Sequence, residues 1–570
     1  MKLTIDSLIS LFNQAYSYTE VAKNPPQPKF NNSYHQKVFI EDGLKRINTK
    51  NTNMFKFYQE IKLLFDRLAD QHLTIDMKSF KLKDAYFTDP LKLFIKEYEN
   101  KSRIFATIKP DASDYKYFRN NDTIFNIIKN NSNVPIKSIK GKDPFDFITE
   151  FGGEYEKFKS PQATFRFKFY EHNLEQNFFD YPLPKEDLYN FSVEYENGDK
   201  FVTDYVVYSK YIINEKILKE EIKSFFDNIK NNKEENINKI LKDLLTFRSD
   251  KLYNKIYNSD SKDINEKIFL AADDRMEWDH YYLNEIGCKF DRNKKINIYG
   301  VLSFSIDTSP DYINTIKSCT ELFDSNNYPI IVVNILNGGG LVTNSQFLIE
   351  AVSPKTTVNI YAAFRNRGLF QESPIIKQLT QTFLDVEDCE SFSYRTFTKS
   401  AKTVDYGNEV SDSILGPLFF NGRGLRQQIY DLRRELKNPR KPTEILLFTD
   451  GFSYSATSIF LKYLQYYGGG ITVGYFPNPN LKDVPYDSSL SPSSILTEDL
   501  LRLLIPNGYK ALNRLDYRFV ITGSQTFYTP NDFTRPLEYE VTPVDEIVNI
   551  YLNDIKNSSD LLKKVIMKFL

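Results

Sequence analysis

The sequence has few histidines, few cysteines and no long hydrophobic run, and each shortage excludes a class of protein. Only four of the 570 residues are histidines and three are cysteines. Cys288, Cys319 and Cys389 lie far apart and are odd in number, so they indicate neither a disulfide framework nor a metal site. We therefore expect buried free thiols. No two histidines have the spacing of a helical metal site, and the sequence predicts no bound metal.

The charges almost cancel, with 74 Lys and Arg against 75 Asp and Glu. Without a basic surplus, the composition favours neither nucleic acid nor an anionic membrane as a partner. The strongest apolar run, residues 328–336, has the length of a strand and falls short of the roughly 18 residues of a membrane span. The N-terminus shows no signal-peptide cleavage site. We expect a soluble protein that is cytoplasmic by default, or secreted if its start has been trimmed.

The length and the residue pattern indicate several units. Hydrophobic residues make up 41% of the chain, and 570 residues exceed what one core usually holds. Four parts are expected: a helical region at 1–83, a mostly β region at 84–213, a charged helical connector at 214–289 and an α/β region at 290–570. Apolar strands that alternate with helices in the last part predict a parallel or mixed sheet covered on both faces.

Individual elements follow from the spacing of apolar residues and turn signals. Strands are expected at 93–98, 104–108, 134–139, 201–208, 296–304, 330–336, 357–361, 444–448, 471–474 and 518–521, with an Asn197-Gly198 hairpin turn. Helices are expected from Leu8 to the stop at Asn24-Pro25-Pro26, and at 55–68, 144–151, 314–323, 344–351, 425–436 and 456–467.

Residues 444–475 form a strand–turn–helix–strand unit with a special point at Ser455. Ser455 lies where the helix is expected to begin, beside unpaired backbone N–H groups and the positive end of the helix dipole. A serine nucleophile and its oxyanion hole can be built together there. The alternative is that Ser453 or Ser455 only caps the helix. A second loop, Asn337-Gly338-Gly339-Gly340, follows another strand, and its glycines allow backbone N–H groups to face a ligand.

The residue inventory limits which nucleophile systems are available. The four histidines are His35, His72, His172 and His280, and all precede Ser455. An α/β-hydrolase requires the chain order Ser, acid, His, so that fold is excluded if histidine is the base. The glycine loop has no Lys-Ser/Thr and is not a P-loop. What remains is a serine at a strand–helix junction, a glycine loop and a base from a distant segment.

Three motifs in order resemble the tail-specific (C-terminal processing) serine protease family. They are Leu68-Ala69-Asp70-Gln71-His72, then Asn337-Gly338-Gly339-Gly340, then Ser453-Tyr454-Ser455-Ala456-Thr457. In that family a "DGH" motif closes the N-terminal helices, an "N-G-G-G" loop ends a core strand, and the middle serine of "S-x-S-A-S/T" is the nucleophile. The stretches KNPP, IKGKDPFDFI and PLEYEVTP are also similar to the branch of chlamydial protease-like activity factor and its fungal relatives.

The resemblance implies a fold and a class of partner. The fold would be α/β, with a crotonase-like (ClpP/crotonase type) core, a helical N-terminal region that supplies the histidine and a small PDZ-like β domain. The partners would be protein or peptide substrates, and a homodimer is compatible with the resemblance. No cofactor and no metal is implied.

The resemblance also implies site residues for a serine-type endopeptidase. His72 would take the proton of Ser455, and Glu538 of the PLEY stretch would orient the imidazole. Glu540 lies on the same face of any strand there and is the alternative to Glu538. The oxyanion donors would be Ala456 together with Gly339 or Gly340.

Two departures from the family pattern leave alternatives open. Some members use a lysine in a G-K-G type loop as the base, but Asn480 occupies that position here and Lys482 lies close by, outside the motif. A Ser-Lys protease that uses Lys482 is therefore one alternative. Gln71 replaces the glycine before His72, and the second alternative is a catalytically inactive homologue that binds peptides as a scaffold.

Overall fold

The computed structural model describes most of the N-terminal half and the core of the C-terminal half. The described residues are 1–50, 52, 54–77, 85–109, 122–155, 158–169, 176–177, 190–204, 206–209, 278–283, 285–304, 310–354, 370–371, 402–405, 411–415, 431, 436–481, 495–496, 517–527 and 535–548. Within these ranges, none of the helices is both long and apolar enough to cross a membrane.

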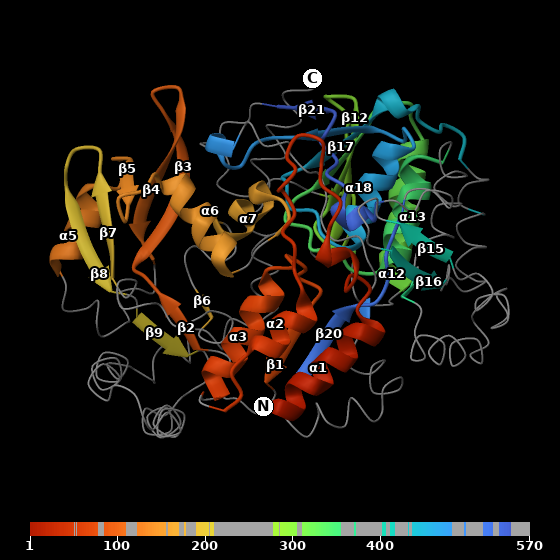
Figure 1. Cartoon of the computed structure of the whole chain (residues 1–570). Helices are drawn as coiled ribbons and strands as arrows, with labels where there is room; N and C mark the ends of the chain where they lie inside the picture. The colour runs from red at the N-terminus through yellow and green to blue at the C-terminus, as the bar shows by residue number, and fades with distance from the viewer. Residues whose placement is uncertain are drawn as a thin grey trace.

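A seven-stranded mixed sheet forms the centre of the C-terminal half (Figure 1). In spatial order its strands are β10 (His280–Tyr282), β11 (Ile286–Asp291), β12 (Ile296–Val301), β13 (Ile330–Asn334), β17 (Ile445–Thr449), β18 (Ile471–Gly474) and β21 (Glu546–Ile547). The pairs from β12 to β21 are parallel, and β10 and β11 are antiparallel additions at one edge. The fold is therefore mixed α/β, and the strands expected at 296–304, 330–336, 444–448 and 471–474 are confirmed.

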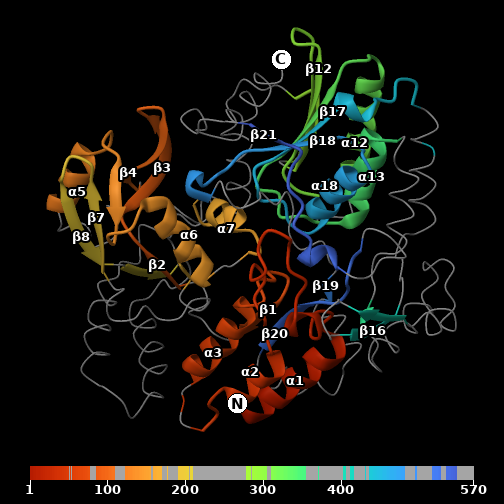
Figure 2. The same ribbon diagram turned by 45° about the horizontal axis from the view of Figure 1, so that its top comes forward.

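Both faces of this sheet are covered, as its continuous apolar strands require. Helices α12 (Pro310–Asp324), α13 (Val342–Val352) and α18 (Ala456–Tyr466) pack on one face, where Ile330 and Val332 point. Ile331 and Val333 alternate to the other face and join the core of the β-rich region. Figure 2 shows the three helices on the side of the sheet away from that region. The helices expected at 314–323, 344–351 and 456–467 are confirmed.

The β-rich region packs on the second face through two helices. Its elements are β3 (Leu91–Tyr98), β4 (Lys101–Ile108), α5 (Asp122–Asn130), β5 (Ile136–Ile139), α6 (Pro144–Tyr155), α7 (Pro161–Phe167), β7 (Asn190–Tyr195) and β8 (Lys200–Asp204). The hairpin turn at Asn197-Gly198 is confirmed, with Gly198 at a positive φ of 91°. Helices α6 and α7 lie between these strands and the central sheet (Figure 1). The expected strand at 201–208 divides between β8 and β9 (Val206–Ser209), which belongs to a small sheet with β2 (Ala85–Thr88) and β6 (Gln176–Asn177).

The N-terminal helices pack beside a second small sheet. They are α1 (Lys2–Ala15), the 3₁₀ turn Val21–Lys23, α2 (Ile40–Arg46) and α3 (Met54–Asp66), and the sheet has the order β1 (Thr74–Met77), β20 (Tyr517–Thr522) and β19 (Ile495–Leu496). The expected strand at 518–521 is thus confirmed as β20, but it pairs with β1 and not with the central sheet. This pairing joins residues more than 400 positions apart and brings the loop before β1 to the C-terminal half.

The expectation that the first helix continues to Asn24 was wrong. α1 ends at Ala15, and Thr19 Oγ1 donates hydrogen bonds to the carbonyls of Phe12 (2.7 Å) and Tyr16 (3.1 Å). A side-chain hydroxyl that binds these carbonyls competes with continuation of the helix. The chain beyond Ala15 is therefore free to enter the core.

The expectation of free thiols was also wrong for two of the three cysteines. Cys288 and Cys319 form a disulfide that joins β11 to α12, with Cα atoms 5.8 Å apart. The pairing arises because α12 packs over β11, a tertiary contact that sequence spacing does not reveal. Cys389 lies outside the described residues, as do Lys482, the expected strand at 357–361, nearly all of the expected helix at 425–436 and the connector from 214 to 277.

Removal of this disulfide is expected to destabilise the core. The bond closes a loop with a sequence separation of 31 residues, for which the chain-entropy relation gives a loss of about 3–4 kcal/mol in the free energy of unfolding for Cys288→Ser. Denaturant unfolding of purified protein measures it. Cys319→Ser should lose a similar amount, and the double variant should lose little more than either single one. Losses that add in the double variant would contradict a bond between these two residues.

Candidate active site

Ser455 lies at a sharp turn between β17 and α18, and its backbone conformation is unusual. Its φ is 53° and its ψ is −117°, a region that residues other than glycine rarely occupy. Ser455 is half-buried, whereas Tyr454 and Ala456 beside it are buried. A strained strand-to-helix turn of this kind exposes a serine hydroxyl at the edge of a sheet.

Neither serine of the motif caps the helix. Ser455 occupies the N-cap position of α18, but its side chain makes no capping hydrogen bond. Ser453 is fully buried, and its Oγ lies 2.8 Å from Thr449 Oγ1. The capping interpretation is therefore wrong for both residues. Ser455 is at the surface of the site and Ser453 is part of its support.

The glycine loop after β13 lies directly against this turn. The Tyr454 N–H donates to the carbonyl of Asn337 at 3.0 Å. A Cβ atom on Gly339 would lie 2.6 Å from Ser455 Cβ and 3.0 Å from the Ala456 nitrogen. Gly339 also has a φ of 104°, which L side chains rarely adopt. Only glycine fits here, because the two loops touch backbone to backbone.

The three amides expected to bind an oxyanion differ in their present partners. The Gly339 N–H donates to Asn337 Oδ1 at 3.0 Å. Among the described residues, the N–H groups of Ala456 and Gly340 donate to no other group of the protein. Ala456 is the first residue of α18, so its N–H also carries the positive end of the helix dipole. Two of the three amides are thus available to an incoming oxygen.

Asp450 supports both loops, a role that the sequence did not predict for it. Its carboxylate is fully buried and pairs with Arg166 of α7, at 2.9 Å from Nε and 2.7 Å from Nη2. The same Asp450 Oδ2 accepts the Leu336 N–H at 3.0 Å, and Oδ1 accepts the Phe452 N–H at 3.1 Å. The one sequence signal is a carboxylate directly after a buried apolar strand, a position where a charge must be paired.

His72 approaches the turn from the loop between α3 and β1. Its ring meets the ring of Tyr454 edge to face, with centroids 4.7 Å apart. Its backbone N–H donates to Asp70 Oδ1 at 3.1 Å, which fixes the loop. His72 Nδ1 is buried and has no hydrogen-bond partner among the described residues, and no bond between His72 and Ser455 is present there. The imidazole therefore lies beside the residue that precedes Ser455, with one ring nitrogen still to be satisfied.

The electrostatic surroundings of His72 favour the neutral imidazole. Burial is the largest influence and lowers the pKa of His72 below its ordinary value of 6.5. The carboxylates of Asp70 and Glu538 oppose this effect and raise the pKa, whereas the Lys159 ammonium lowers it further. The net lowering keeps the ring able to accept a proton at neutral pH.

Glu538 comes from a 3₁₀ turn, Leu537–Tyr539, near the C-terminus of the described chain. Its side chain is 4% exposed, and its Oε2 accepts a hydrogen bond from the Tyr18 hydroxyl at 2.9 Å. Glu540, the alternative, is half-buried and pairs with Arg535 at 3.1 Å. Of these two glutamates, Glu538 is the one whose charge acts on His72.

Lys462 attaches the glutamate segment to the serine helix. It lies on α18, is 1% exposed, and donates from Nζ to the carbonyls of Leu537 (3.2 Å) and Glu540 and to Thr542 Oγ1 (3.3 Å). The helix that begins beside Ser455 thus holds the backbone on both sides of Glu538. Sequence spacing alone does not reveal this contact.

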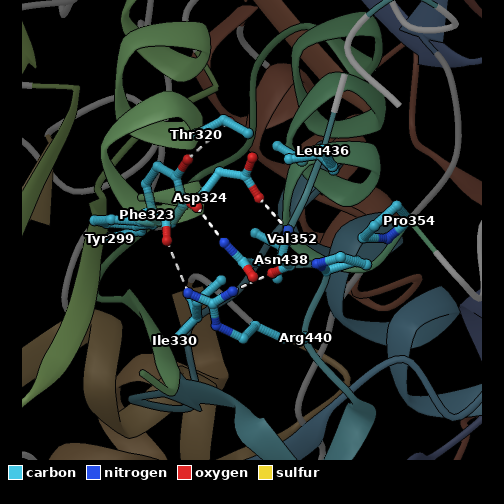
Figure 3. A pocket seen from close by; sticks show the side chains of 12 residues that line it. Tyr299, Thr320, Phe323, Asp324, Ile330, Val352, Pro354, Leu436, Asn438 and Arg440 are labelled. Atoms are coloured by element: carbon cyan, nitrogen blue, oxygen red, sulfur yellow. Dashed lines mark hydrogen bonds between the residues drawn. The ribbon is translucent and has the colours of Figure 1, made fainter. Parts of the chain in front are cut away.

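A pocket elsewhere in the core is lined by residues that connect several segments of the fold (Figure 3). It lies at the opposite end of the sheet from Ser455, where Ile330 begins β13 and α12 ends. Arg440 lines it and donates to the carbonyls of Phe323 (2.8 Å), Asn326 (2.7 Å) and Tyr328 (2.6 Å). These bonds hold the end of α12 to the turn that leads into β13. No group of His, Cys, Asp and Glu suited to a metal ion occurs among the described residues.

No protein-family model and no curated protein matches the chain. Among the solved structures that resemble it, mature CPAF, the chlamydial protease-like activity factor, has a TM-score of 0.49 and 11% identity over 99% of this chain and 95% of that one. A photosystem II D1 C-terminal processing protease has a TM-score of 0.30 and 8% identity over 96% and 92%. A Bacteroides fragilis protein assigned to the S41 proteases has a TM-score of 0.35 and 10% identity over 100% and 97%. They are of the tail-specific protease family that the motifs resemble. All three TM-scores lie below 0.5.

The contact between the two loops gives a direct test. Gly339→Ala introduces a methyl group 2.6 Å from Ser455 Cβ at a positive φ, so we expect the free energy of unfolding to fall by about 1–3 kcal/mol. Gly338→Ala is the matched control, because no atom lies within 4 Å of its added Cβ, and it should change stability by less than about 0.5 kcal/mol. Urea unfolding measures both. Equal effects of the two substitutions would show that the loops do not touch as described.

Proposed function

We propose that this protein is a serine endopeptidase that hydrolyses peptide bonds through an acyl-enzyme on Ser455. His72 is the general base and Glu538 orients its imidazole. One observation carries the proposal: a half-buried serine in a strained turn lies against a glycine loop, an unpartnered helix N-terminal amide and the Tyr454 side chain that the His72 ring contacts. A nucleophile, anion-binding amides and a neutral base are thus gathered from three distant segments.

The reaction follows from these roles. His72 accepts the Ser455 proton as Oγ attacks the scissile carbonyl carbon, and the carbonyl oxygen becomes an oxyanion. The N–H groups of Ala456 and Gly340 stabilise that charge. The imidazolium then gives its proton to the leaving amine, which departs and leaves an ester on Ser455. Water, activated by the same base, hydrolyses the ester and restores the serine.

In this proposal Glu538 acts on His72 by its charge and by a hydrogen bond to Nδ1. Support comes from the unsatisfied Nδ1 of His72 and from the effect of the Glu538 charge on the pKa of that ring. The two groups are not hydrogen-bonded in the described arrangement, so the proposal requires a shift of the histidine loop to complete the triad. Catalytic hydrogen bonds are often long before a substrate binds.

The finer architecture belongs to the same proposal. We assign 1–83 as the helical region that supplies the histidine, 84–213 as a PDZ-like domain, 214–289 as a connector and 290–570 as a crotonase-like protease core. A PDZ-like domain would bind protein or peptide substrates by adding a strand to a sheet edge. The packing of the β-rich region against the central sheet supports a single catalytic body.

Active-site labelling tests the nucleophile and the base together. A fluorophosphonate probe should label the wild-type protein and not Ser455→Ala, since the probe forms its bond with an activated serine. His72→Ala should slow labelling by at least about a hundredfold, the usual contribution of a general base. Mass spectrometry locates the label, and the time course gives the rate.

Controls separate the two alternatives. Lys482→Ala should label at the wild-type rate. If it abolishes labelling while His72→Ala does not, the Ser-Lys protease is the correct reading. A folded wild-type protein that is not labelled at Ser455 would support the peptide-binding scaffold.

The pH dependence of labelling tests the surroundings of His72. Protonated imidazole cannot accept the serine proton, so the rate should fall as the pH drops through the pKa of His72. Burial lowers that pKa, and the midpoint of the acidic limb should therefore lie below the ordinary value of 6.5. Rates measured across the acidic and neutral range give the midpoint. A midpoint above 6.5 would mean that the carboxylates outweigh burial.

A further inference from the structure

The chain between α1 and the first 3₁₀ turn lies between the two segments that serve the proposed base. Tyr16 and Tyr18 are each 1% exposed. The Tyr16 hydroxyl donates to Asp70 Oδ2 at 3.1 Å, and the Tyr18 hydroxyl donates to Glu538 Oε2 at 2.9 Å. Residues 16–18 therefore contact both the histidine loop and the glutamate turn, which are separated by more than 450 positions in the sequence. Figure 1 shows α1, from which this segment emerges, next to β20.

We infer that residues 16–18 are a positioning element that sets the histidine loop and Glu538 relative to each other through two tyrosine hydroxyls. This inference rests on the proposed function and assigns new roles to Tyr16 and Tyr18. Neither tyrosine contacts Ser455 or a substrate in the proposed reaction. Each acts through the carboxylate that it binds.

The backbone of the segment is fixed independently of the two hydroxyls. The Ser17 N–H donates to the Thr522 carbonyl at 3.1 Å, and Gln525 Nε2 donates to the Ser17 carbonyl at 2.7 Å. Thr19 Oγ1 holds the preceding turn by its bonds to Phe12 and Tyr16. Because both sides of the Ser17 peptide are held, the backbone that carries the two tyrosines is fixed without the two carboxylates.

The Tyr16 hydroxyl acts on the histidine loop through Asp70. Asp70 Oδ2 accepts from Tyr16 and also from Thr522 Oγ1 at 2.6 Å, which leaves Oδ1 to receive the His72 N–H. Two donors on one oxygen fix the carboxylate plane, and that plane fixes where the His72 backbone lies. Loss of the Tyr16 hydroxyl leaves the Thr522 hydrogen bond to Asp70 in place, so we expect Asp70 to keep most of its orientation.

The Tyr18 hydroxyl acts on the Glu538 carboxylate, whose charge influences the His72 imidazole. A neutral hydroxyl donor stabilises the Glu538 carboxylate as an ion and turns one oxygen away from solvent. The Tyr18 ring packs edge to face against Tyr539, with centroids 5.7 Å apart, which holds its direction. Among the described residues, the charged groups that act on the pKa of His72 are Asp70, Glu538 and Lys159. The Tyr18 hydroxyl donates to Glu538, which is one of these three groups.

The test uses Tyr18→Phe, which removes one hydroxyl and keeps the ring. With the fluorophosphonate probe we expect the maximal labelling rate to fall about tenfold, as for loss of a hydrogen bond to a charged group, with unchanged probe affinity. The acidic limb of the pH profile should move to higher pH. Without the donor, the Glu538 charge acts more strongly on His72 and raises its pKa.

Tyr299→Phe is the matched control. Tyr299 is equally buried, and its hydroxyl lies 3.3 Å from Thr320 Oγ1 in the pocket at the opposite end of the sheet from Ser455. It should lower thermal stability and leave the labelling rate and the pH midpoint unchanged. If Tyr18→Phe behaves in the same way, its role is only structural and the inference is wrong.

A double-mutant cycle tests whether Tyr18 acts through Glu538. In a Glu538→Gln background, Tyr18→Phe should change the labelling rate by less than about twofold, because its target is already neutral. Tyr16→Phe should lower the labelling rate less than Tyr18→Phe does, since the Thr522 hydroxyl still donates to Asp70. If Tyr18→Phe does not fold, the labelling rate of Tyr16→Phe is the measurement that tests the inference. If the effects of Tyr18→Phe and Glu538→Gln on the labelling rate are fully additive, the inference is wrong and the proposed function still stands. Absence of Ser455 labelling in the wild type overturns the proposed function and the inference together.

Discussion

The site depends on the parallel pairing of β13 and β17. Parallel neighbours end at the same edge of a sheet, so the loop after β13 and the turn after β17 leave it side by side. At that edge Asn337 accepts the Tyr454 N–H, and Gly339 lies against Ser455 with no room for a side chain. The strained conformation of Ser455 persists because both loops press on it and α18 begins directly after it. A one-residue change of register would separate the glycine loop from the serine.

The sheet edge supplies the serine and the amides, but the histidine and the glutamate must be brought to it. Three buried polar contacts do this work: β1 pairs with β20 behind the histidine loop, Asp70 accepts the His72 N–H, and Lys462 binds the backbone around Glu538. Hydrogen bonds of this kind are directional, so they fix positions that apolar packing leaves loose. In the proposed mechanism the N-terminal helices therefore contribute to the site.

How far the sequence predicts this arrangement depends on the range of the interaction concerned. Local patterns predict a strand at 444–448, a helix at 456–467 and the unusual place of Ser455 between them. The structure has the strand at Ile445–Thr449 and the helix at Ala456–Tyr466. Motif order predicts that His72 lies near that serine, and in the structure its ring contacts Tyr454, the residue before Ser455. The Cys288–Cys319 bond, the end of α1 at Ala15 and the roles of Asp450 and Lys462 are not predicted. The disulfide and the roles of Asp450 and Lys462 depend on partners far away in the sequence, which no periodicity encodes. The end of α1 depends on a local side chain, Thr19, whose bonds compete with the helix.

The buried pair of Asp450 and Arg166 shows what such a partner contributes. Moving two charges out of water is unfavourable, and buried ion pairs often add nothing to stability compared with apolar residues of the same volume. Here the carboxylate also receives the N–H groups of Leu336 and Phe452, one from each loop of the site. An apolar pair could fill the same space, but it could not accept those two amides. We interpret the pair as an element that fixes geometry. Arg166 orients the Asp450 carboxylate, and that carboxylate holds the glycine loop and the serine turn at a fixed distance from each other.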